Sequence, residues 1–211
     1  MRIGALVRSY GTTKYLRAVA KQYDWVDRLL IMNYRFNGVI PRQDRTRDIL
    51  QELNQPNVEI MTGENFNQHE VFNLGFSMLK DCDYIFVSDS DEIITKQDQK
   101  KMLEGIEDYD AGVCNIIDYK TDYYHRIPQR THKPLVLAKN TLKFYDVRCY
   151  TGRCKEFPIN IHHFGFVNEE ADIQWKFNWE KAWEGSTIGD LYGQPVLPCE
   201  LPKEVEEMLN A

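Results

Sequence analysis

The sequence predicts an α/β fold: a single domain with a mostly parallel central sheet flanked by helices. In the first half of the chain, short apolar runs alternate with segments whose apolar residues recur at helical spacing. The apolar runs are hydrophobic on both faces, which is typical of parallel strands covered by helices on each side. With 211 residues and 43% hydrophobic content, the chain can bury the core of such a domain.

The first elements are two strands, the helix between them and a third strand. Residues 3–7 form a short apolar run, and the apolar residues over 16–23 recur at helical spacing. A second apolar run follows at 29–32. After a charged segment, residues 58–61 form the third predicted strand.

The same alternation continues through the middle of the chain. Asn67 is a suitable N-cap for a helix with a single apolar stripe. This helix leads into a buried strand that begins at residue 84 and ends at the acidic sequence DSDE. Thr95 then caps a further helix, which precedes a strand over 111–117.

The second half of the chain has weaker periodicity. Residues 118–134 are rich in tyrosine and basic side chains without a period, which predicts a long loop over a functional site. The run 141–150 is strand-like, and tryptophans at four-residue spacing over 175–183 predict a helix. The acidic, helix-like end of the chain lacks a clear cap, so we expect a domain excised from a longer protein.

Composition excludes several classes of partner. The formal charge of -6, from 32 acidic and 26 basic side chains, gives no overall attraction to nucleic acid or to anionic membranes. Apolar runs are far shorter than the ~20 residues of a membrane span, and the amino-terminal run is too short for a signal peptide. The five cysteines lack the spacing of a zinc site or of a disulfide framework. We therefore expect a cytoplasmic protein with reduced thiols, which binds no nucleic acid and spans no membrane.

The acidic sequence at residues 89–92 lies where a parallel sheet binds its ligands, beyond the carboxyl end of a strand. Asp89, Asp91 and Glu92 repel one another unless a positive charge is present, and Mg²⁺ or Mn²⁺ is the simplest candidate. The chain has no GxxxxGK[ST] loop, and Ile94 stands where a calcium loop needs glycine. A solvated turn of helix-capping acids stays open. Glu92 is the least assigned of the three carboxylates, and one interpretation is that it only marks the start of the helix after Thr95.

Two further groups of residues suit a site of this kind. His162 and His163 are adjacent, so on an extended segment only one of them is expected to enter the site. An imidazole beside carboxylates favours Mn²⁺ over Mg²⁺. At the end of the first strand, Arg8, Ser9 and Tyr10 offer a guanidinium, a hydroxyl and an aromatic face to a nucleotide.

Together these residues resemble the GT-A class of nucleotide-sugar glycosyltransferases, and family-2-like members in particular. In that class the first strand ends beside the nucleotide, as VRSYG does, and a helix precedes the DxD strand, as in FNLGFSMLKDCDYIFVSDSDE. A later histidine completes the metal site, as in HHFGFV. A narrower resemblance is to the amino-terminal glycosyltransferase modules of large chlorella-virus proteins of capsid glycan synthesis. The resemblance implies a single GT-A, Rossmann-like domain, with residues 1–117 binding the nucleotide sugar and 118–211 on the acceptor side.

The resemblance also implies roles for individual residues. Asp91 would be the principal ligand of Mn²⁺ or Mg²⁺, Asp89 would reach both the donor and the metal shell, and His163 would be a further ligand. Two positions depart from the family pattern: Asn33 replaces a common acid, and Phe72 replaces the arginine of an Arg-Asn pair. The residues expected to bind the donor are Arg8, Ser9, Tyr10, Asn33, Asn73, Ser90 and Lys176.

The function implied is transfer of a hexose or deoxyhexose from a UDP-sugar to a carbohydrate hydroxyl, in which the ion stabilises charge on the UDP leaving group. An inverting transfer needs a general base, for which Asp118 and Asp122 are the nearest candidates along the chain. A retaining transfer needs no such base, and both outcomes stay open. Two alternatives are a sugar-phosphate nucleotidyltransferase, although VRSYGTTK lacks a glycine-rich loop, and a non-catalytic carbohydrate-binding module that uses aromatic stacking.

Overall fold

The structure is a computed structural model of the chain. It describes residues 1–9, 14–35, 46–53, 56–64, 68–128, 132–146, 149–167 and 195–210. Within these ranges, no helix is long and apolar enough to cross a membrane.

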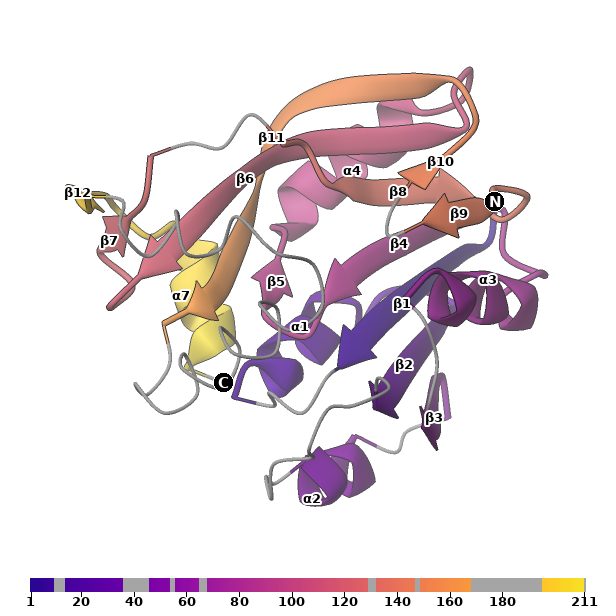
Figure 1. Cartoon of the computed structure of the whole chain (residues 1–211), viewed down its shortest axis with the longest axis horizontal. Helices are drawn as coiled ribbons and strands as arrows, with labels where there is room; N and C mark the ends of the chain where they lie inside the picture. The colour runs from indigo at the N-terminus through magenta and orange to yellow at the C-terminus, as the bar shows by residue number, and fades with distance from the viewer. Residues whose placement is uncertain are drawn as a thin grey trace.

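Four parallel strands form the core of the sheet: β1 (Ile3–Ser9), β2 (Arg28–Arg35), β3 (Val58–Glu64) and β4 (Tyr84–Asp89). Their order across the sheet is β4-β1-β2-β3, as Figure 1 shows. All four predicted strands are therefore confirmed, and their carboxyl ends meet at one edge of the sheet. This edge is where parallel sheets bind their ligands.

Helices connect these strands, as parallel neighbours require. The helix α1 (Leu16–Gln22) follows β1, α2 (Thr46–Glu52) follows β2, and α3 (Gln68–Met78) follows β3. The next helix, α4 (Lys96–Gly105), begins as predicted, because the Thr95 hydroxyl accepts a hydrogen bond from the Asp98 backbone N–H. Asn67, the other predicted cap, lies outside the described residues.

The other half of the sheet is mixed. An antiparallel strand, β8 (Leu135–Lys139), lies between β4 and β6 (Ala111–Lys120), and β6 also pairs in parallel with β11 (Cys154–Phe166). The short β5 (Glu92–Ile93) pairs with β11 close to the carboxyl edge. β8 was not predicted, because LVLAK is too short to show a period among the polar residues around it.

The predicted loop over 118–134 is wrong at its start. Residues 118–120 continue β6, because this strand keeps its pairing with β11 as far as Lys120. The two-residue strand β7 (His125–Arg126) then turns back onto β6 and pairs with β12 (Leu197–Pro198).

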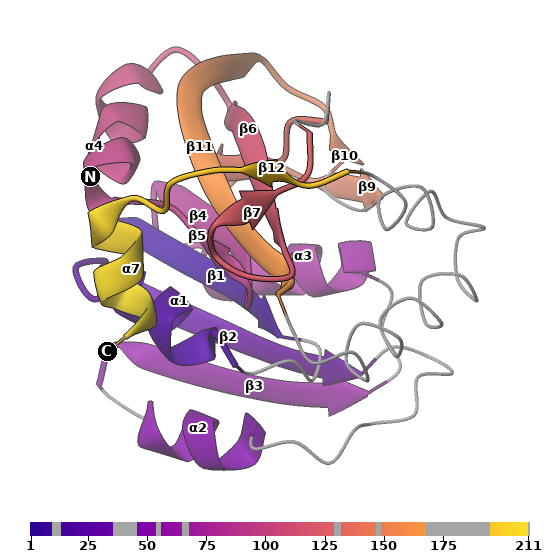
Figure 2. The same ribbon diagram turned by 90° about the vertical axis from the view of Figure 1, so that its left-hand side faces the viewer.

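Short elements complete the described chain. The strand-like run 141–150 contains β9 (Phe144–Asp146) and β10 (Cys149–Tyr150), which form a separate two-stranded sheet. The predicted acidic helix is α7 (Lys203–Leu209), which lies beside α1 in Figure 2. The tryptophan stripe over 175–183 lies outside the described residues.

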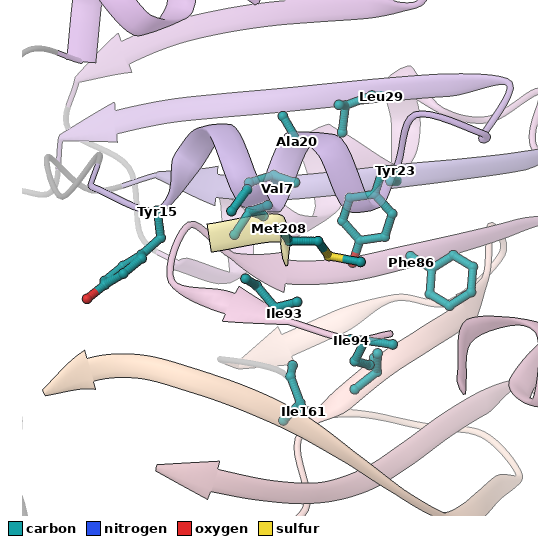
Figure 3. Close-up of a cluster of buried hydrophobic side chains, with 14 of the residues drawn as sticks. Val7, Tyr15, Ala20, Tyr23, Leu29, Phe86, Ile93, Ile94, Ile161 and Met208 are labelled. Atoms are coloured by element: carbon teal, nitrogen blue, oxygen red, sulfur yellow. The ribbon is translucent and has the colours of Figure 1, made fainter. Parts of the chain in front are cut away.

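Buried side chains cover both faces of the sheet. On the face of α1 and α4, Val7 and Phe86 point into the cluster drawn in Figure 3. On the face of α3, Leu6 and Phe72 pack in a second cluster. Gly75 lets α3 approach β1 closely, since a Cβ there would lie 2.7 Å from the Leu6 side chain. The alternation of Leu6 and Val7 between the two faces reflects the twofold period of a strand.

Candidate active site

The acidic sequence forms a tight turn between β4 and β5. The Asp89 backbone N–H donates to the Glu92 carboxylate at 2.8 Å, and the Ser90 N–H donates to the Arg8 carbonyl at 2.8 Å. Glu92 is buried and accepts the hydrogen bond from Asp89, so it closes the turn and does more than mark the start of α4. The reason is geometric: three residues after Asp89, its side chain reaches back to close the turn. These bonds fix the backbone that carries Asp89 and Asp91.

Asp91 and His163 face each other at the carboxyl edge of the sheet. Asp91 Oδ2 lies 3.6 Å from His163 Nε2, and both residues are more than nine-tenths buried. The Asp91 carbonyl also accepts a hydrogen bond of 2.8 Å from the Phe164 N–H, which ties the turn to β11. The two side chains come from segments about seventy residues apart in the sequence and are held together by the backbone pairing of β5 with β11.

A second carboxylate lies behind the His163 ring. Asp118 Oδ1 is 2.5 Å from His163 Nδ1, and the two residues are register partners in the parallel pair of β6 and β11. Burial by itself favours a neutral ring, but the charges of Asp91 and Asp118 raise the pKa of His163 to about 9. The site therefore favours a positive charge between these two carboxylates.

The neighbouring histidine points to the opposite face of β11, as expected for adjacent residues of a strand. His162 Nδ1 and the Tyr119 hydroxyl form a hydrogen bond of 2.8 Å, and the two rings stack. Burial lowers the pKa of His162 to about 4 and outweighs the opposing charge of Asp98. This histidine is neutral and belongs to the core.

Arg8 engages the first aspartate of the turn. Its Nε donates to Asp89 Oδ1 at 2.7 Å, and its guanidinium carbon lies 4.2 Å from the centre of the Phe72 ring. Arg8 is almost fully buried, whereas the Asp89 side chain is 24% exposed. A guanidinium is thus present beside Phe72 on α3, but it is supplied by β1.

The other residues expected to bind the donor have varied surroundings. Ser9 is buried at the end of β1, beside Asn33 in the register of β2, and its hydroxyl has no hydrogen-bond partner among the described residues. The Asn73 side chain donates to the Phe144 carbonyl and accepts from the Phe144 N–H, so it anchors β9 to α3. Ser90 is buried in the turn. Tyr10 and Lys176 lie outside the described residues.

The two candidate general bases differ in exposure. The Asp118 side chain is 1% exposed and is bonded to His163, whereas that of Asp122 is 48% exposed. Asp122 accepts from His125 Nδ1 at 2.8 Å, and this hydrogen bond holds the pKa of Asp122 below its usual value. The loop begins at Thr121, whose φ of 72° is unusual for a β-branched residue.

Comparison with known proteins identifies the family of the chain. Residues 41–175, more than half of the chain, match the sequence model of Glycosyl transferase family 2. The chain belongs to this family. The matched segment of the glycosyltransferase includes Asp89, Asp91, Asp118 and His163. No curated protein matches the chain.

Solved structures share the fold of the glycosyltransferase. S. aureus TarS 1–349 is 13% identical, with a TM-score of 0.54 over 89% of this chain and 74% of that chain. The same TarS fragment in complex with UDP-GlcNAc is 14% identical, with a TM-score of 0.53 over 78% of this chain and 58% of that chain. HddC from Yersinia pseudotuberculosis in complex with GMP-PN is 12% identical, with a TM-score of 0.51 over 85% of this chain and 100% of that chain. At these identities the likeness shows the fold, which is the predicted mixed α/β fold of the GT-A class.

Sequence reasoning missed two features of the site in this glycosyltransferase. The first is the bond from Glu92 to the backbone of Asp89, for which the spacing of three residues was the only available signal. The second is the pairing of Arg8 with Asp89, which are separated by 81 positions. No local pattern indicates this second contact, because it arises only when β1 and β4 pair.

Proposed function

We propose that this family-2 glycosyltransferase transfers a hexose or deoxyhexose from a UDP-sugar to a carbohydrate hydroxyl, with Mn²⁺ or Mg²⁺ held by Asp91 and His163. The observation that carries the proposal is the position of these two side chains. A carboxylate oxygen and an imidazole nitrogen face each other at 3.6 Å, at the edge where a parallel sheet binds its ligand.

The side chains at this edge fit a divalent cation. Asp91 and His163 would hold the ion, because a carboxylate oxygen and an imidazole nitrogen, both of which bind such cations, face each other at 3.6 Å. The described residues contain no group of three or more His, Cys, Asp or Glu side chains arranged around one point. The remaining ligands would therefore be donor phosphates and water, as is common for Mg²⁺, and the imidazole favours Mn²⁺. When bound, the ion stabilises negative charge on the diphosphate leaving group.

Different side chains of the site would make different contacts with the donor. Arg8 balances the charge of Asp89 and orients it through Oδ1. Because Asp89 is partly exposed while Asp91 is buried, Asp89 is the carboxylate better placed to accept hydrogen bonds from the ribose or the sugar. Ser9 ends β1 and Asn33 is its register partner in β2, so both would be candidates for contacts with the nucleoside.

Similarity to other proteins supports the proposed donor and acceptor. The TarS fragment was solved with UDP-GlcNAc, which supports a UDP-sugar as donor. The resemblance to modules of capsid glycan synthesis supports a glycan as acceptor. In an inverting transfer, exposure favours Asp122 over Asp118 as the residue that takes the acceptor proton.

The test is titration calorimetry of UDP with and without Mn²⁺, on the wild-type protein and on Asp91→Ala. We expect binding that depends on Mn²⁺ and is lost in the variant. Asp91→Asn is the matched variant, which keeps the shape of the side chain but removes its charge. UDP binding that needs no metal and survives Asp91→Ala contradicts the assigned role.

A panel of UDP-sugars then identifies the donor through release of UDP. The fold shared with HddC, which was solved with GMP-PN, makes nucleotidyl transfer the alternative to test in the same panel. Release of pyrophosphate from a nucleoside triphosphate and a sugar phosphate, without release of UDP from any UDP-sugar, favours that alternative.

A further inference from the structure

We propose that Asp118 is a positioning residue that orients the His163 ring, and that it is not the general base of the reaction. The role as an outer partner of a metal ligand rests on the proposed function. The orientation of the ring rests only on the contacts between β6 and β11.

The hydrogen bond is fixed by the sheet itself. Asp118 and His163 are register partners on adjacent parallel strands, so backbone pairing sets the distance between their side chains. The contact of 2.5 Å between Oδ1 and Nδ1 is short even for a charge-assisted bond. Exposure of only 1% and 11% for the two side chains leaves little room for the ring to rotate.

The contact also decides which ring nitrogen faces the site. An ionised carboxylate only accepts hydrogen bonds, so it keeps a proton on His163 Nδ1. Nε2 is then the nitrogen presented to Asp91, at 3.6 Å. Histidines that bind metals commonly donate their second N–H to a carboxylate in this way, and loss of that partner weakens metal affinity.

A buried position is unsuitable for a general base. A base must reach the hydroxyl proton of the acceptor directly or through one water molecule. Asp118 is nearly inaccessible, and its Oδ1 is engaged by the imidazole. The same strands supply a natural control on the opposite face, where Tyr119 holds His162 through the same ring nitrogen.

The experiment compares Asp118→Leu, Asp118→Asn and Tyr119→Phe in titrations of UDP with Mn²⁺. Asp118→Leu cannot accept a hydrogen bond, so its Mn²⁺-dependent affinity should fall by roughly 10- to 100-fold. Asp118→Asn should lose less, because its amide oxygen still accepts from Nδ1–H. Tyr119→Phe should bind as the wild type does. Thermal unfolding of each variant confirms that the protein used in the titration is folded.

A second readout is independent of the metal and of activity. In metal-free protein with ¹⁵N-labelled histidine, the proton on His163 Nδ1 should be strongly deshielded by the short bond, and this signal should vanish in Asp118→Leu. Unchanged Mn²⁺-dependent affinity together with an unchanged His163 signal in Asp118→Leu overturns the positioning role, while the proposed function stands. Absence of Mn²⁺-dependent UDP binding in the wild-type protein instead overturns the proposed function, and the metal-related part of this inference with it.

Discussion

His162 and His163 are neighbours on one strand, yet they have opposite electrostatic surroundings. Both are buried, and in both the Nδ1 atom bonds to a side chain of β6. The partner of His162 is the phenol of Tyr119, and burial lowers the pKa of His162 to about 4. The partner of His163 is a carboxylate, and with Asp91 opposite, the pKa of His163 rises to about 9 despite the burial. Nearby charge, and not depth, separates a core histidine from a site histidine here.

The contrast follows from the twofold period of a strand. One face of the β6 and β11 pair carries Asp118 and His163 and meets the acidic turn. The other carries Tyr119 and His162 and joins Phe164 in an aromatic stack. A single step along each strand changes a polar site into a packed core.

Removal of His163 is expected to have the largest effect on stability. We expect His163→Ala to lower the free energy of unfolding by about 3–5 kcal/mol, because the buried carboxylates of Asp91 and Asp118 lose the positive group between them. Urea unfolding measures this change, and titration with UDP and Mn²⁺ should show no metal-dependent binding. His163→Gln, which retains a donor for Asp118, is the control and should lose less stability. A urea midpoint equal to that of the wild type would show that the pairing contributes nothing.

The Arg8 guanidinium is a second buried charge of the site, and it is paired with Asp89. We expect Arg8→Met to lower the free energy of unfolding by about 2–3 kcal/mol, since a hydrogen bond to a charged group is lost while packing on Phe72 is largely kept. It should also weaken binding of the UDP-sugar, because Asp89 is no longer oriented. Arg8→Lys keeps the positive charge but lacks the planar guanidinium, so its stability and donor affinity should lie between those of the wild type and Arg8→Met. Donor affinity equal to that of the wild type in Arg8→Met would contradict a role for Arg8 through Asp89.

A smaller loss of stability is expected when the partner of the core histidine, Tyr119, is changed. Tyr119→Phe leaves His162 Nδ1 without its partner, so we expect a loss of about 1–2 kcal/mol in unfolding free energy. Affinity for UDP and Mn²⁺ should be unchanged, which calorimetry can verify. A drop in metal-dependent affinity would show that the two faces of the strand pair are not independent.

The smallest effect is expected at the N-cap of α4. Thr95→Ala removes the hydroxyl that caps α4, and we expect it to cost about 1 kcal/mol. Thermal unfolding measures this loss, and donor binding serves as the negative control. Thr95→Ser retains the capping hydroxyl and should match the wild type, so an equal loss in both variants would point to packing of the methyl group instead of the cap.

Much of the fold could be predicted from the sequence, because its signals are local. The four parallel strands, the cap at Thr95 and the turn that follows β4 each depend on residues within a few positions of one another. The opposite orientation of His162 and His163 follows from strand geometry alone. The predicted family is also confirmed, since residues 41–175 match the model of Glycosyl transferase family 2.

The rest depended on pairings between distant segments. Whether Asp118 meets His163 is decided by the register of β6 against β11, across 45 residues. Whether Arg8 meets Asp89 is decided by β1 against β4, across 81 residues. Local sequence signals are therefore sufficient to locate the strand ends and the side chains available there. The pairing of each carboxylate with its cation requires the folded sheet, because local periodicity contains no information on the register between strands.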